Sequence, residues 1–143
     1  MTGLLTMTIG SDFLATGDGQ PHLARIDAQS RVEPLGEPVG FFEDGWVRAH
    51  ARFSIRALDA ITSISLEVWS PPDAEPLSIT VQVSHGPTTT LTAPRGRVAV
   101  LQFPLEIPPL GERSIEVSAE RERQLSDRDR RQAAYKLGCI GLY

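Results

Sequence analysis

EDGWVRAHARFSIR, residues 43–56, alternates apolar and polar side chains. Because successive side chains of a β-strand point to opposite faces of the sheet, this pattern predicts a half-buried strand over about residues 46–55. The positions predicted to enter the core are Val47, Ala49, Ala51, Phe53 and Ile55. The opposite face carries an aromatic and cationic row, which is either a solvated surface or a place where a ligand binds. The members of this row are Trp46, Arg48, His50 and Arg52.

Similar short alternating segments follow one another along the chain, with turn residues between them. They lie at about residues 4–9, 61–69, 77–84, 88–92, 98–105, 114–121 and 137–143. Many short strands with one solvated face each predict two antiparallel sheets packed face to face. We therefore expect an all-β fold, a two-sheet antiparallel β-sandwich of jelly-roll or Greek-key type.

Two segments depart from this pattern. EPLGEPVG, residues 33–40, is so rich in proline and glycine that we expect no regular structure there. SDRDRRQAAY, residues 126–135, has a serine that would cap a first helical turn, with acidic residues near the start and arginines further along. One short surface helix is predicted near residues 126–135.

Length and charge narrow the range of functions. A chain of 143 residues suits a single domain over 1–143, and a net charge of −4 argues against general binding to nucleic acid or to anionic membranes. Cys139 is the sole cysteine, so no internal disulfide forms. The start MTGLLTMTIG resembles neither a secretion signal nor a membrane span. These features predict a cytoplasmic protein.

Catalytic and metal-binding motifs are weak in the sequence. The three histidines stand alone, without HxH, HxxxH or CxxC spacing, and no GxSxG motif is present. Cys139 lies in an apolar strand, where a cysteine is usually an unreactive core residue. We predict no enzyme activity, no metal and no cofactor. A cupin-like metal-dependent enzyme stays open as an alternative if the fold brings His50 and His85 together.

Binding is the better hypothesis. Indole rings stack on the apolar faces of sugars, and arginines hydrogen-bond hydroxyl or acidic groups. In this interpretation Trp46 stacks on a saccharide, Arg48 and Arg52 hold its polar groups, and Asp44 and His50 adjust its orientation. Two alternatives remain: Trp46 folds back to cover an end of the core, or an outer sheet face forms a homo-oligomer.

Four stretches carry a resemblance to a known family. They are GFFEDGWVRAHARFSIR at 40–56, ISLEVWSPPDAEPLSITVQVSHG at 64–86, VAVLQFPL at 98–105, and DRDRR before LGCIGLY at 137–143. Together, over about residues 40–143, they resemble the β-sandwich module fused to or encoded beside bacterial glycosyltransferases of surface polysaccharide assembly.

The resemblance implies a non-catalytic accessory module of glycan synthesis that binds a saccharide weakly or docks to a glycosyltransferase. It also implies a buried Asp–Arg pair that ties the last loop to the sandwich in a structural role. Asp127, Asp129 and Arg130 are the candidates for that pair, and the choice among them stays open.

Overall fold

The computed structural model describes residues 31–73 and 75–143, and every regular element in these ranges is a β-strand. The strands are β1 (Val32–Phe41), β2 (Trp46–Ala57), β3 (Ile61–Trp69), β4 (Leu77–Val83), β5 (Thr88–Ala93), β6 (Val98–Ile107), β7 (Glu112–Ala119), β8 (Arg123–Gln124), β9 (Gln132–Ala133) and β10 (Tyr135–Leu142). The described ranges accordingly hold no helix that could cross a membrane.

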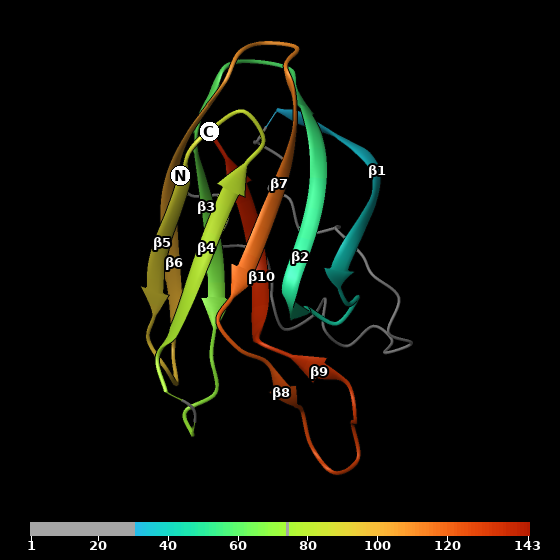
Figure 1. Ribbon diagram of the computed structural model, residues 1–143, viewed down its shortest axis with the longest axis vertical. Helices are drawn as coiled ribbons and strands as arrows, with labels where there is room; N and C mark the ends of the chain where they lie inside the picture. Colours follow the sequence, from blue (N-terminus) through green and yellow to red (C-terminus); the bar gives the residue numbers. More distant parts are fainter. Residues whose placement is uncertain (1–30, 74) are drawn as a thin grey trace.

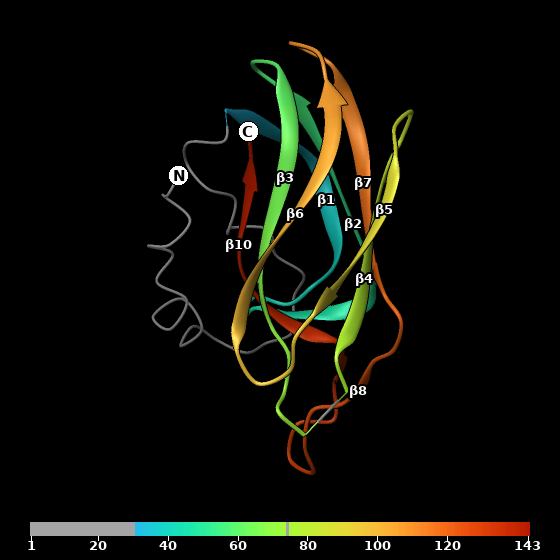
Figure 2. The ribbon, with the colours of Figure 1, turned by 90° about the vertical axis from the view of Figure 1, so that its left-hand side faces the viewer.

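The strands form two layers, seen face-on in Figure 1 and edge-on in Figure 2. Hydrogen-bonded neighbours follow the order β5-β4-β7-β2-β10-β3-β6, with β1 added beside β2 and β8-β9 as a separate pair. All these pairings are antiparallel. The strands β5, β4, β7, β2 and β1 make the first layer, and β10, β3 and β6 make the second. The predicted antiparallel β-sandwich is confirmed.

The core lies between the layers and takes the predicted face of β2. Phe53 and Ile55 are almost wholly buried, and Phe41 from β1 meets the Phe53 ring edge-on with 5.9 Å between the ring centroids. Alternation along β4 and β7 buries the same kind of apolar row from the neighbouring strands. One face of the first layer is therefore apolar and packed, and the other is left to solvent.

The prediction of irregular structure at residues 33–40 is wrong, because these residues belong to β1. This edge strand pairs with β2 on one side and tolerates its two prolines at that position. Two register shifts break the ladder between Leu35 and Phe41. Gly40, with a φ of 89°, supplies a left-handed backbone there and lies so close to β2 that a Cβ would approach the His50 carbonyl oxygen to 2.5 Å.

The predicted helix at residues 126–135 is also wrong. Ser126 Oγ accepts the backbone N–H groups of Arg128 and Asp129, which is the contact expected of a cap, but it closes a turn. The chain then enters β9 and β10, where Ala133 and Tyr135 are buried at alternate positions. Burial at a period of two outweighs the local capping signal. The segment therefore forms the loop and second strand of the β8–β9 hairpin and the start of β10.

Some predictions fall on residues that the structure does not describe. The strand expected at residues 4–9 and the histidine at position 22 lie outside residues 31–73 and 75–143. The assignment of residues 1–143 to a single domain therefore stays a prediction.

Candidate functional site

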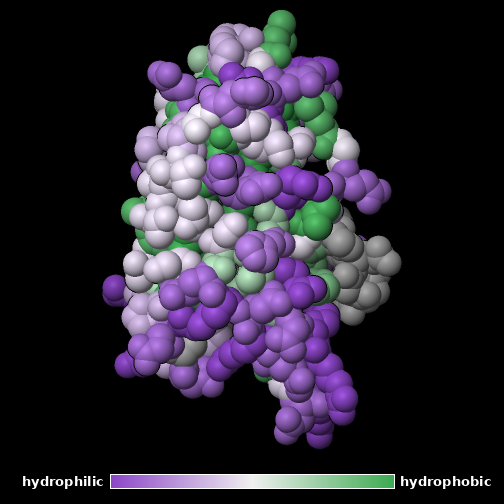
Figure 3. Space-filling view, in the orientation of Figure 1, coloured by the Kyte–Doolittle hydropathy of each residue, from purple (hydrophilic) through white to green (hydrophobic). Residues whose placement is uncertain are grey.

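The outer face of the first layer presents polar side chains from β4, β7 and β2. In its central row, Gln82 of β4 lies opposite Glu116 of β7, and Glu116 lies opposite Arg52 of β2. Val39 of β1 extends this row beyond Arg52 and is about half exposed. Figure 3 shows this face covered mostly by hydrophilic and intermediate residues. This face is exposed to solvent, and the hydrogen-bonded register of the strands fixes where each of these residues lies.

Arg52 differs from the arginines on either side of it along β2. The guanidinium of Arg48 forms a two-pronged pair with Glu122, and that of Arg56 bonds both Glu33 and Glu112. Arg52 has no ion pair or hydrogen bond from its guanidinium to any described residue, Glu116 included. Its donors are therefore available to a ligand.

Two shallow hollows adjoin Arg52 and Glu116. The first hollow, of about 220 Å³, is lined by Val39, His50, Ala51, Arg52, Glu116 and Ser118. The second hollow, of about 240 Å³, is lined by Arg52, Gln82, Ser84, Ser114 and Glu116. The same cation and the same carboxylate thus line both hollows.

These groups suit the recognition of hydroxyls. A guanidinium only donates hydrogen bonds, a carboxylate only accepts them, and serine and glutamine side chains do both. A hydroxyl placed between Arg52 and Glu116 would accept from one and donate to the other. No cluster of three or more His, Cys, Asp or Glu side chains that could hold a metal occurs in residues 31–73 and 75–143.

No protein-family model and no curated protein matches the sequence. Among solved structures, the chain is similar to a CBM35 from Cellvibrio japonicus Abf62, with a TM-score of 0.48 and 8% identity over 90% of this chain and 85% of that one. It is also similar to a family 35 carbohydrate-binding module from an environmental isolate, with a TM-score of 0.49 and 14% identity over the same shares of the two chains. At these values neither similarity assigns the chain to a family.

The structure separates the residues that the sequence placed in one row. His50 and Arg52 reach the first hollow, as the binding hypothesis requires. Trp46 lies elsewhere: its ring is edge-on to that of Trp69 on β3, with 6.1 Å between centroids, and the Lys136 ammonium lies 5.4 Å from its centroid. Trp46 therefore lines neither hollow. The structure does not bring its indole ring together with Arg52 at one site.

Arg48 belongs to a structural contact. Glu122 accepts hydrogen bonds from Arg48 Nε and Nη2 and from the backbone N–H of Ala49, at 2.7–3.0 Å. These hydrogen bonds lower the pKa of Glu122 to about 2, and the bonds from the Arg48 side chain contribute most. The contact fastens the segment after β7 to β2.

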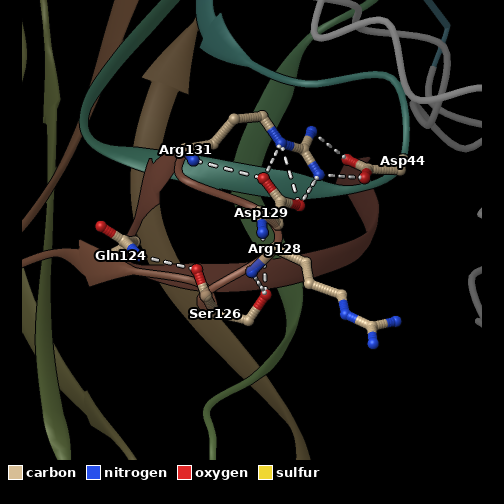
Figure 4. A network of polar contacts seen from close by, with 6 residues as sticks. All are labelled: Asp44, Gln124, Ser126, Arg128, Asp129 and Arg131. Atoms are coloured by element: carbon tan, nitrogen blue, oxygen red, sulfur yellow. Dashed lines mark hydrogen bonds and ion pairs between the residues drawn. The ribbon is translucent and has the colours of Figure 1, made fainter.

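Asp44 also has a structural role, shown in Figure 4. Arg131 donates to both carboxylate oxygens of Asp44, at 3.1 and 2.6 Å, and also to Asp129. Hydrogen bonds from Arg131 lower the pKa of Asp129, and the two carboxylates raise that of Arg131. The Arg131 guanidinium lies 4.8 Å from the centroid of the Phe42 ring. Of the residues expected to form a buried Asp–Arg pair, Asp129 is paired, but with Arg131 and not Arg130, and the pair is only partly buried.

Glu67 lies on β3 together with Trp69. Its side chain is 6% exposed, burial raises its pKa, and its Oε1 has no hydrogen-bond partner. It lines neither of the two hollows.

The sequence alone did not identify the residues that lie beside Arg52 on β7 and β4. Alternation marks Gln82, Ser114, Glu116 and Ser118 as outward-facing. It does not reveal that β7 lies between β2 and β4, since the three strands are far apart in the chain. Strand order, which the local pattern leaves open, creates the site.

Proposed function

We propose that this chain is a non-catalytic β-sandwich module that binds saccharides weakly through the outer face of β2, β7 and β4. One observation carries the proposal: Arg52 presents an unengaged guanidinium next to Glu116 and between two hollows. The hollows are open and smaller than the roughly 300–1,000 Å³ of enclosed ligand pockets, which favours weak binding of a small polar ligand.

The test is a titration of the isotope-labelled chain with soluble neutral and acidic saccharides at millimolar concentration, followed by NMR. We expect backbone amide shifts confined to residues 50–52, 82–84 and 114–118. Arg52→Ala should weaken binding at least tenfold, because Arg52 lines both hollows and its guanidinium is not engaged by another described side chain. Arg56→Ala is the matched control, since Arg56 is occupied by Glu33 and Glu112, and should bind like the wild type.

Two outcomes would overturn the proposal. One is the absence of amide shifts with every saccharide of the panel. The other is binding that Arg52→Ala leaves intact while the variant keeps the wild-type spectrum elsewhere.

The sequence resemblance adds a second part to the proposal, namely that the module works in the cytoplasm beside a bacterial glycosyltransferase of surface polysaccharide assembly. The support for this part is the set of stretches at 40–56, 64–86 and 98–105. We expect the gene of this chain to lie among glycosyltransferase genes, and a setting without them would remove this part alone.

Self-association is a second candidate function, favoured by the outer side of β6. Val98 and Val100 are each 51% exposed there, and Val98 lies opposite Trp69 in the register. Exposed apolar side chains that adjoin aromatic rings are typical of contact surfaces. Light scattering should then show a dimer that Val100→Glu dissociates, whereas a monomer at all concentrations would exclude this candidate.

A further inference from the structure

The two hollows share one boundary. Arg52 and Glu116 face each other across β2 and β7, and both residues line both hollows. His50 and Ser118 line only the first hollow, while Gln82 lines only the second. The face is therefore divided into two similar compartments on either side of one shared pair.

The compartments are displaced along the strands as well as across them. On β7 the first hollow extends to Ser118 and the second to Ser114, and Glu116 lies midway between the two. Two residues of a strand rise by roughly 7 Å, so the centres of the hollows are about that far apart along β7. A single sugar ring cannot fill both hollows, whereas two linked rings can.

The shared pair also bears on the charge of the ligand. A ligand unit in either hollow meets the Glu116 carboxylate as well as the Arg52 guanidinium. A carboxylate on the ligand would gain the arginine but would lie beside a like charge, which is unfavourable. A neutral hydroxyl satisfies both groups at once.

We propose that the outer face of β2, β7 and β4 holds two adjoining subsites, divided by Arg52 and Glu116, for a neutral oligosaccharide of at least two units. This inference rests on the proposed saccharide binding and specifies the length and charge of the ligand. The ligand runs obliquely across the three strands, with one unit in each hollow.

A chain-length series tests the inference. Calorimetry or NMR would compare the mono-, di- and trisaccharides of glucose, galactose, xylose and mannose with galacturonic acid and its dimer. We expect the best neutral disaccharide to bind at least tenfold more tightly than its monosaccharide. The trisaccharide should add less than threefold, and the acidic dimer should bind no more tightly than the neutral one.

Single-subsite variants provide the second arm. His50→Ala and Gln82→Ala each remove an exposed side chain from one hollow only. Each should weaken disaccharide binding at least fivefold, whereas the amide shifts that a monosaccharide causes at the other, intact hollow should persist. Gln102→Ala, an exposed position on β6, is the matched control and should change neither.

Glu116→Gln provides the third arm. It keeps the hydrogen-bonding side chain and removes the charge, so it should improve binding of the acidic dimer relative to the neutral dimer at least fivefold.

The outcomes separate this inference from the proposed function. If no saccharide binds, the proposed function fails and the inference fails with it. If saccharides bind at Arg52 but the disaccharide gains less than twofold over the monosaccharide, the two-subsite inference alone is wrong. An acidic dimer that binds the wild type tenfold more tightly than every neutral dimer overturns the assignment of a neutral ligand.

Discussion

Tyr135 at the start of β10 is among the largest side chains that are fully buried in the described residues, and its hydroxyl has no hydrogen-bond partner. Burial raises the pKa of the phenol, because the charged form would be left without water. An unpaired buried hydroxyl costs stability, on the order of 1–3 kcal/mol. Tyr135→Phe should therefore leave the free energy of unfolding unchanged or increase it by about 1 kcal/mol, measured by urea denaturation. A loss greater than that amount would show that the hydroxyl is satisfied.

Arg131 joins two carboxylates that lie far apart in the chain. Asp44→Asn removes the charge that receives its two-pronged bond, and the loss of charge-assisted hydrogen bonds should destabilise the fold by about 2 kcal/mol. Urea denaturation measures the effect. Asp127→Asn, on an exposed position of the β8–β9 loop that carries Asp129 and Arg131, is the control and should change stability by less than about 0.5 kcal/mol. Equal effects of the two variants would contradict a specific role for Asp44.

At the scale of elements, β1 depends on a glycine where it crosses β2. Gly40→Ala would bring a Cβ to 2.5 Å from the His50 carbonyl oxygen in a backbone with positive φ, so β1 must move away. We expect a loss of about 2–4 kcal/mol in urea denaturation. Gly36→Ala is the matched control: its φ is also positive, at 68°, but nothing lies within 4 Å of an added Cβ. It should cost about 1–2 kcal/mol. A smaller loss for Gly40→Ala than for Gly36→Ala would show that β1 yields easily.

The same elements show how far local sequence reasoning reaches. The period-two pattern predicted β2, β3 and β4 well, because burial on one face leaves a regular trace in the sequence. Composition misled at β1, where pairing at a sheet edge outweighs proline and glycine content, and the helix-capping signal misled at residues 126–135, where Ser126 caps a turn. For the site, it placed His50 and Arg52 on an open face but could not supply Glu116, whose position depends on strand order.

At the scale of the whole molecule, ion pairs that join the segment between β7 and β10 to the rest of the fold determine how the stability of the protein responds to acid. Glu122 has a pKa of about 2 in the folded chain and about 4.3 in an unfolded chain. Because folding lowers this pKa, the stabilisation is complete above about pH 5 and is lost as the pH falls through 4 toward 2. Hydrogen bonds from Arg123 and Arg131 lower the pKa values of Asp73 and Asp129 in the same direction.

We therefore expect the free energy of unfolding to be nearly constant from pH 7 to 5 and to fall steeply below pH 4. Urea denaturation at several pH values measures this profile. Glu122→Gln should lower the stability at pH 7. It should also make the loss of stability below pH 4 less steep, because the carboxylate that takes up a proton there is gone. Glu106→Gln, on an exposed position of β6, controls for the loss of one negative charge. If stability falls as steeply below pH 4 in Glu122→Gln as in the wild type, the role of Glu122 is contradicted.

Most residues lining the two hollows belong to β2, β4 and β7, each of which is hydrogen-bonded to a neighbour on both sides. Such a surface exists before the ligand arrives, so association needs no loop to close and should proceed close to the rate of encounter. A shallow surface with few contacts also releases its ligand quickly. Complexes on this face should therefore last for less than about a millisecond, and a protein that needs to hold a glycan for longer would have to present several such faces at once.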